Sequence, residues 1–407
     1  MKKKSAGKTK LVLGIIFVVL CLILGYSIAM RTMVSNSALK IKLSNELQGT
    51  QTDESASTAE VQAVETAENS LSSLQQGSDG EEFSEVPESQ GENEAEKYPD
   101  SSHMTAALRG SEIMLVKQGD PYVEPGAFAV DDRFGIIGDY EVQGADKIDT
   151  STVGDYIIEY TIKSENALAK ISRTVRVLSP ESFGANCSGV PVMMYHCVYT
   201  ASEPPAKINS NYILDSKLDK QLAWLKENAY YFPSFAELRA YVDGRISLPA
   251  KSIILTFDDA DAGFLKYGRA LLEKHEIPGT TFIIGAFDAE NQIKANPSRY
   301  LSYESHSYDM HKGGGNIGLG GIISALSYEE IQADLSRAIE LLKSRAAFAY
   351  PYGDVTETAV QAIRSLDILC SFTTAFGKVK VGDNPARLSR VRVLGESSLE
   401  GFIWSIG

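Results

Sequence analysis

Cysteine is scarce in this sequence, with four residues among 407. Cys21 lies in an apolar run near the N-terminus, and only Cys187, Cys197 and Cys370 follow it. Their spacing is not that of a metal-binding motif, which excludes a cysteine metal site. The sequence allows a disulfide between Cys187 and Cys197, but it favours three separate thiols.

An excess of basic charge is also absent. The chain has 39 basic and 53 acidic side chains, and residues 43–100 contain fifteen of the acidic ones and a single lysine. The remainder carries 38 of each sign, so no nucleic-acid partner is expected. The composition, 43% hydrophobic and 23% charged, excludes a wholly disordered chain and a collagen-like fibre.

The N-terminus has the pattern of a membrane anchor. A basic tail (residues 1–10) precedes an uncharged run of twenty residues (11–30), which as a helix is about 30 Å long, enough to cross a bilayer. The lysines of the tail predict a cytoplasmic N-terminus. The alternative is a signal peptide cleaved after Ala29, but the run is longer than a usual signal core. We expect an uncleaved, single-pass anchor.

The next segment is predicted to be a stalk. Residues 31–108 carry a net negative charge, are rich in Ser, Glu, Gln, Ala and Thr, and are poor in aromatics. Such a segment buries too little apolar surface to fold, and its like charges extend it.

Residues 109–180 have the pattern of a small all-β sandwich. Turn residues separate four expected strands, at residues 113–116, 127–130, 156–162 and 171–177. The runs PYVEPGAFAVDD and IDTSTVGDYIIEYTI resemble the immunoglobulin-like domains of bacterial surface proteins. The resemblance implies a spacer or a glycan-contacting module, and we favour the spacer.

From residue 188 onward, strand patterns alternate with helical patterns. Residues 252–257 (SIILTF) and 280–284 (TTFII) read as buried strands on either side of a helix at 263–275. This alternation predicts an α/β fold with a parallel sheet, open or closed into a barrel, and a site at the carboxyl ends of its strands. Ser327 and Glu330 predict a capping box before a further helix.

Three groups of polar residues lie where these strands should end: Asp258 and Asp259, then His306 and His311, then residues 348–353 (FAYPYG). Read alone, the aspartate pair could cap a helix, and the Pro-Gly segment could be a simple turn. The histidines are five apart, so they can converge only through a turn, which excludes a helical HExxH site. Together, however, two imidazoles and a carboxylate could bind a catalytic divalent ion, with a second carboxylate as base. This set predicts the hydrolysis of an amide or ester.

These residues carry a resemblance to a known family. Residues 190–407 resemble the polysaccharide deacetylases (NodB homology, carbohydrate esterase family 4), which remove N-acetyl groups from amino-sugar polymers. The resemblance is to the branch with a PVxMYHxV motif, here PVMMYHCV at residues 191–198, followed by TFDD, SHSYDMH and YPYG. It implies a distorted (β/α) barrel over residues 188–407.

The resemblance also implies roles for individual residues. Asp258 would be the general base, and Asp259, His306 and His311 would bind a divalent metal, with zinc preferred. The backbone N–H of Tyr352 would stabilise the oxyanion, while Tyr350, Pro351 and Gly353 would shape the substrate groove.

The sequence departs from the family pattern at three places. Ala260 replaces the usual glycine after TFDD, and no histidine lies near the C-terminus to act as the general acid. His196 is therefore the candidate acid, although it could be a core histidine. The arginine that usually precedes the Pro-Tyr-Gly turn is also missing, so Arg390 or Arg392 must orient Asp258, and we select Arg390.

These features together predict a metal-dependent N-deacetylase on the outer side of a bacterial, Gram-positive cell membrane. Its expected substrate is a cell-envelope polysaccharide, either peptidoglycan or poly-N-acetylglucosamine, and no obligate protein partner is implied. Two alternatives stay open: an O-acetyl esterase acting on a glycan, and an inactive glycan-binding protein.

Overall fold

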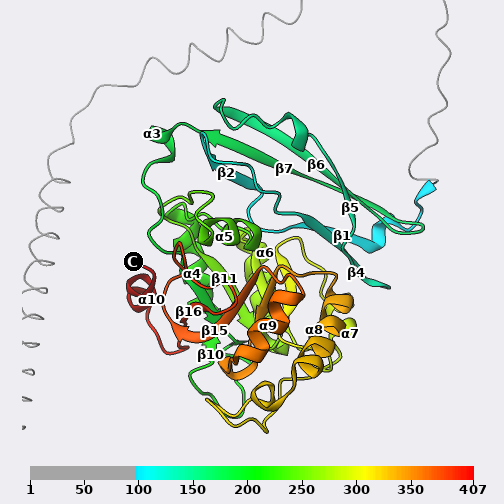
Figure 1. Ribbon diagram of the computed structural model, residues 1–407, viewed down its shortest axis with the longest axis vertical. Helices are drawn as coiled ribbons and strands as arrows, with labels where there is room; N and C mark the ends of the chain where they lie inside the picture. Colours follow the sequence, from blue (N-terminus) through cyan, green and yellow to red (C-terminus); the bar gives the residue numbers. More distant parts are fainter. Residues whose placement is uncertain (1–96) are drawn as a thin grey trace, which may run out of the picture. The chain divides into compact units, whose positions relative to one another are not determined.

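The computed structural model describes residues 97–407 (Figure 1). The expected cytoplasmic tail, membrane helix and most of the stalk lie outside this range. Within it, no helix is both long and apolar enough to span a bilayer. The three cysteines in the described part are all free thiols, as the sequence favours.

Residues 101–178, here called the β module, form two sheets around one core. The first sheet has the order β1 (Met104–Leu108), β3 (Ala127–Asp131), β4 (Gly135–Ile137), and the second β2 (Ile113–Lys117), β7 (Leu168–Leu178), β6 (Gly154–Lys163), β5 (Tyr140–Gln143). Short 3-10 turns lie at η1 (Ser101–His103) and η2 (Ala145–Lys147). Alternate side chains of β6, including Ile158, Tyr160 and Ile162, are buried between the sheets.

We expected the stalk to extend to residue 108, but residues 104–108 form strand β1 instead. The segment MTAAL pairs antiparallel along its whole length with β3, so the folded module begins before residue 109. The five residues of β1 have little intrinsic β-propensity, so it is the pairing with β3 that makes them a strand.

Seven parallel strands close into a barrel, in the order β11-β12-β13-β14-β15-β16-β8. They are β8 (Val192–Tyr195), β11 (Ile254–Asp258), β12 (Gly279–Ile283), β13 (Leu301–Ser305), β14 (Ala347–Ala349), β15 (Cys370–Phe376) and β16 (Leu388–Arg392). A short parallel pair, β9 (Cys197–Tyr199) and β10 (Tyr212–Leu214), follows β8. The α/β class expected from the sequence is confirmed.

Helices surround this barrel (Figure 1). They are α4 (Asp215–Glu227), α5 (Phe235–Val242), α6 (Arg269–His275), α7 (Ala289–Ala295), α8 (Tyr328–Leu342), α9 (Glu357–Ser365) and α10 (Leu399–Ile406), with a short π-helix at η3 (Phe264–Gly268) and 3-10 turns at η4 (Ile322–Ala325) and η5 (Pro351–Gly353). The short helix α3 (Pro180–Phe183) instead contacts β2 and β7 of the β module (Figure 1). The capping box of Ser327 and Glu330 is present at the start of α8.

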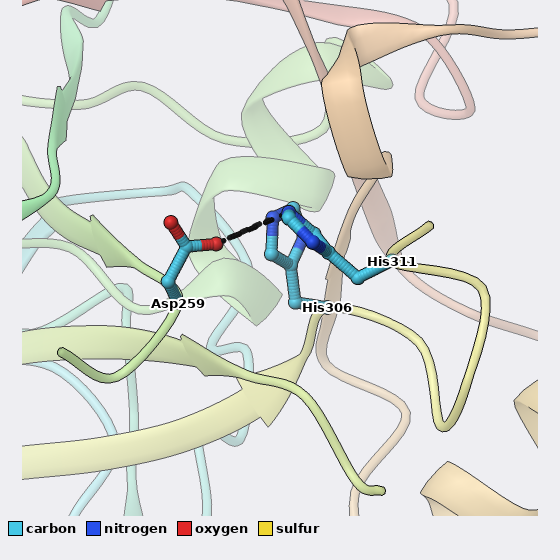
Figure 2. Close-up of side chains that lie close together, drawn as sticks. All are labelled: Asp259, His306 and His311. Atoms are coloured by element: carbon cyan, nitrogen blue, oxygen red, sulfur yellow. Dashed lines mark ion pairs between the residues drawn. The ribbon is translucent and has the colours of Figure 1, made fainter. Parts of the chain in front are cut away.

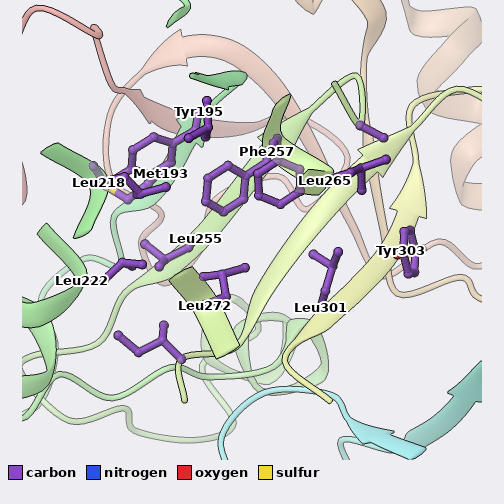
Figure 3. Close-up of a cluster of buried hydrophobic side chains, with 14 of the residues drawn as sticks. Met193, Tyr195, Leu218, Leu222, Leu255, Phe257, Leu265, Leu272, Leu301 and Tyr303 are labelled. Atoms are coloured by element: carbon purple, nitrogen blue, oxygen red, sulfur yellow. The ribbon is translucent and has the colours of Figure 1, made fainter. Parts of the chain in front are cut away.

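The outward faces of the strands form a core with these helices (Figure 3). Tyr195 of β8 stacks on Phe257 of β11, with 4.9 Å between ring centroids, and Phe257 stacks on Phe264 at 4.1 Å. Because side chains alternate along a strand, residues next to these point into the barrel. Thr256 and Asp258 are buried there, so β11 carries its acidic residue to the barrel's interior.

Candidate metal centre and active site

Three residues that we predicted as metal ligands converge at the carboxyl ends of β11 and β13 (Figure 2). Asp259 Oδ1 lies 3.4 Å from His306 Nε2 and 3.3 Å from His311 Nε2. The three possible ligand atoms all lie within 4.8 Å of one another. In the described part of the chain, this is the one such group of histidine, cysteine and acidic residues.

Backbone strain brings Asp259 to this place. Asp258 already points into the barrel, so a regular strand would turn Asp259 to the opposite face. Instead Asp259 has φ = +72° and Ala260 has φ = +49°, both in the left-handed region. This turn directs two consecutive carboxylates into one site.

A tight turn makes the two histidines converge. Ser307 has φ = +74°, and its hydroxyl accepts a hydrogen bond from the N–H of Met310 at 3.0 Å. Asp334 of α8 accepts the N–H groups of Tyr308 and Asp309, each at 2.7 Å. Asp334 has no local sequence signal, because it lies on a helix more than twenty residues away along the chain, and sequence reasoning missed it.

The donor atoms fit a divalent cation. His306 Nδ1 lies 2.7 Å from the carbonyl oxygen of Ala349, and because a carbonyl only accepts, Nδ1 carries the hydrogen. The lone pair of Nε2 therefore faces Asp259. Asp259 Oδ1 is buried without a hydrogen-bond partner, which a bound cation would provide.

The charge of the cluster is consistent with this fit. Burial alone would raise the pKa of Asp259, but His306 and His311 lower it well below the usual range, so the carboxylate is ionised. Burial alone would lower the pKa of His306, but Asp259 and Asp258 raise it. The site thus has a negative potential that a cation would balance.

Asp258, the predicted base, is held by Arg390. Nη1 of Arg390 donates to Oδ1 at 2.7 Å and Nη2 donates to Oδ2 at 2.8 Å. Burial opposes ionisation, but the charge and hydrogen bonds of Arg390 lower the pKa of Asp258 below its usual value. Arg392, the alternative, is exposed and contacts Asn211 instead.

His196, the candidate acid, follows β8 and opens to the same site. Its Nε2 atom lies 4.0 Å from Asp258 Oδ2, and its side chain is 16% exposed. Burial lowers its pKa, although Asp258 and Asp259 act in the opposite direction. The alternative of a core histidine remote from the site does not fit this position.

The turn η5 places Tyr352 beside the histidines. Its ring stacks on that of His311, with 5.0 Å between centroids and 23° between planes. Its φ of +61° and that of Gly353, +77°, shape the turn, and a Cβ at Gly353 would lie 2.2 Å from Thr374 Oγ1. The backbone of η5 therefore borders the candidate metal site.

We expected Tyr350 and Pro351 to shape the substrate groove, but both residues are buried. Tyr350 has no exposed surface, and its hydroxyl donates to the carbonyl of Ala386 at 2.9 Å. Pro351 is also buried. Tyr350 packs against Phe348 in the core under η5, so its contribution is to support the turn and not to contact a substrate.

Comparison with known families gives two matches. Residues 245–370 match the polysaccharide deacetylase family, and residues 106–177 match the Ig-like domain of bacterial surface proteins. The first match includes Asp258, Asp259, His306, His311 and the η5 turn.

Curated relatives carry the name poly-beta-1,6-N-acetyl-D-glucosamine N-deacetylase. The protein from Escherichia coli (strain K12) is 24% identical over 235 residues, which cover 47% of this chain and 35% of the relative. The one from Staphylococcus aureus (strain MRSA252) is 24% identical over 206 residues, covering 46% of this chain and 69% of the relative. The chain thus spans about a third of the length of the Escherichia coli relative.

Among solved structures, IcaB from Ammonifex degensii is 25% identical, with a TM-score of 0.45, and the alignment covers 55% of this chain and 99% of that one. The two family matches agree with the resemblances seen in the sequence. This chain therefore contains one segment that matches the polysaccharide deacetylase family and another that matches the Ig-like domain of bacterial surface proteins.

Proposed function

We propose that this protein is a metal-dependent N-deacetylase of a cell-envelope polysaccharide built from N-acetylglucosamine. The observation that carries the proposal is the convergence of Asp259, His306 and His311 beside an ionised Asp258 that Arg390 orients. The names of the relatives support the reaction and the class of polymer.

A divalent cation held by the ligand cluster would supply Lewis-acid chemistry for amide hydrolysis, and zinc suits two imidazoles and one carboxylate. Asp258 would accept a proton from the attacking water. The N–H of Tyr352 would donate to the oxyanion of the tetrahedral intermediate. His196 would protonate the leaving nitrogen as the carbon–nitrogen bond breaks, which yields acetate and a free amine.

The proposal includes the cellular location. The basic tail and apolar run at residues 1–30 support a single-pass anchor with the enzyme outside the cell. The match of residues 106–177 to a domain of bacterial surface proteins supports the same side of the membrane.

Acetate release by the full 407-residue chain tests this function. The substrates are poly-N-acetylglucosamine, peptidoglycan and O-acetylated xylan, each with added zinc and with Asp259→Ala as the control. We expect acetate from an N-acetylated polymer, and none from the variant. Release from xylan alone would indicate an esterase, and zinc binding without any release would favour a glycan-binding protein.

A further inference from the structure

We propose that the β module completes the catalytic domain, because its Arg109 holds the buried Glu304 of the barrel and thereby positions His306. Arg109 is in this sense a positioning residue, and the module is more than the spacer we favoured from the sequence. The inference uses the proposed function only in taking His306 as a metal ligand.

The segment that carries Arg109 is fixed on both sides. Within the module, the buried Arg173 donates to the carbonyl oxygens of Ser111 at 2.5 Å and of Arg109 at 2.8 Å. Toward the barrel domain, the N–H of Ser111 donates to the carbonyl of Phe232 at 3.0 Å. Gly110 has φ = +79°, and a Cβ there would lie 2.7 Å from the backbone nitrogen of Ser234, so the two backbones approach closely.

This segment directs Arg109 into the barrel domain. The guanidinium of Arg109 forms an ion pair with Glu304 of β13. Glu304 is 1% exposed, and the Arg109 side chain is 16% exposed. The same carboxylate accepts the hydroxyl of Ser344, at 2.9 and 2.8 Å, and the N–H of Ala347 at 3.2 Å. Arg109 is the one cation among these partners.

Glu304 links the two strands that determine the geometry of His306. Glu304 lies in β13, two residues before His306, and side chains two residues apart along a strand point to the same face. A displacement of β13 would therefore also displace His306. The bond of Glu304 to Ala347 ties β13 to the first residue of β14, and the last residue of β14, Ala349, accepts His306 Nδ1. The Glu304 carboxylate is therefore linked both to the strand that carries His306 and to the strand whose carbonyl orients the His306 ring.

Loss of Arg109 would disturb this arrangement. A buried carboxylate without its cation is costly, and it moves toward water if it can. A cavity of about 300 Å³, lined by Arg109, Gly110, Ser234, Thr280, Glu304 and Ser344, adjoins the ion pair and gives it room to move. Such a shift would pull on both strands and displace Nε2 from its place opposite Asp259.

Zinc affinity, measured by competition with a chromogenic chelator, tests the proposal on the full chain. Arg109→Met should weaken zinc binding about tenfold, as expected when a ligand loses its outer support. The double variant Arg109→Met with Glu304→Gln, which removes both charges, should recover to within about threefold of the parent. Glu304→Gln alone should have the smaller effect of the two single variants, because the unpaired Arg109 can reach water.

The matched control is Asp120→Ala. Asp120 also belongs to the contact between module and barrel domain, since its carboxylate accepts the N–H of Ser247 at 2.6 Å, but that bond does not involve β13 or β14. Its zinc affinity should equal that of the parent. If Arg109→Met binds zinc as the parent does, or if Asp120→Ala weakens zinc equally, the proposal is overturned.

A further variant covers the case in which Arg109→Met does not fold, as judged by thermal denaturation. Ser344→Ala removes the hydroxyl donor from the same carboxylate without altering the module, and it should weaken zinc about fivefold. Unchanged affinity in Ser344→Ala would then reject the link through Glu304. Because zinc binding is the readout, a parent that binds zinc but releases no acetate refutes the proposed function and leaves this test intact.

Discussion

Arg390 and Asp258 form a two-point ion pair inside the barrel, with N–O distances of 2.7 and 2.8 Å and with both side chains almost fully buried. Such a pair fixes the plane of the carboxylate as well as its charge. It leaves the acid beside the metal-ligand cluster ionised and aimed in one direction.

Replacing Arg390 should change the pH dependence of the reaction. In the parent, Arg390 holds the pKa of Asp258 below its usual value against the effect of burial, which favours the ionised base. In Arg390→Met, burial still raises the pKa of Asp258, and only the smaller effects of His306 and His196 oppose it. The acidic limb of the kcat/KM profile should therefore move to higher pH. A shift of one pH unit corresponds to about a tenfold loss at a fixed acidic pH.

The control for this experiment is Arg392→Met on the same strand. Arg392 is exposed and contacts Asn211, so its removal should leave the acidic limb in place. An unshifted limb in a folded Arg390→Met variant would mean that Asp258 is not the group whose ionisation limits the rate.

The fold was largely predictable from apolar periodicity, and the exceptions have physical reasons. The runs SIILTF and TTFII are strands β11 and β12, because a strand buried on both faces reads as a continuous apolar run. Strand β1 was missed because its five residues depend on pairing with β3. The closure of seven strands into a barrel depends on register across the whole sheet, which no local pattern encodes.

For the candidate site, the sequence predicted which residues take part better than it predicted which residues contact one another. Arg390 and Arg392 have the same parity on β16, so alternation could not distinguish them, and only the three-dimensional contact with Asp258 does. Tyr350 was expected to shape the substrate groove, and its burial was missed because the motif gives residue types but not burial. The supports from Asp334 and Glu304 join segments distant in sequence and carry no local signal.

Removing the carboxylate of the metal cluster should weaken metal binding. Asp259→Asn keeps the size of the side chain but removes the charge that balances a dication beside His306 and His311. We expect zinc affinity, measured by calorimetry, to fall at least tenfold and acetate release to be lost. In the parent, a chelator should abolish activity and added zinc should restore it. A parent still active after exhaustive chelation would contradict the assignment of these ligands.

Replacing His196 should separate catalysis from metal binding. His196 lies 4.0 Å from Asp258 and is not among the residues grouped around Asp259 Oδ1. His196→Gln should therefore lower kcat by about 10²- to 10⁴-fold, the usual contribution of a general acid, while zinc affinity changes by less than threefold. Loss of zinc binding in proportion to kcat would instead show that His196 supports the metal cluster.

Ala260 gives a prediction about stability that follows from one backbone angle. Its φ of +49° costs a residue with a Cβ roughly 1–2 kcal/mol, and glycine does not incur that cost. The methyl group is buried, 3% exposed, so its removal costs about 0.8 kcal/mol. Ala260→Gly should accordingly increase the free energy of unfolding by up to about 1 kcal/mol, measured by urea denaturation of the full chain.

The comparison for Ala260→Gly is Ala333→Gly in the middle of α8, where the backbone is helical. There glycine should lower the free energy of unfolding by about 1 kcal/mol, because it loses more conformational entropy on folding. The two substitutions are chemically identical and are expected to have opposite signs. If both substitutions destabilise the protein equally, neighbouring residues relieve the backbone strain at Ala260. The turn that brings Asp259 into the site then does not depend on that strain.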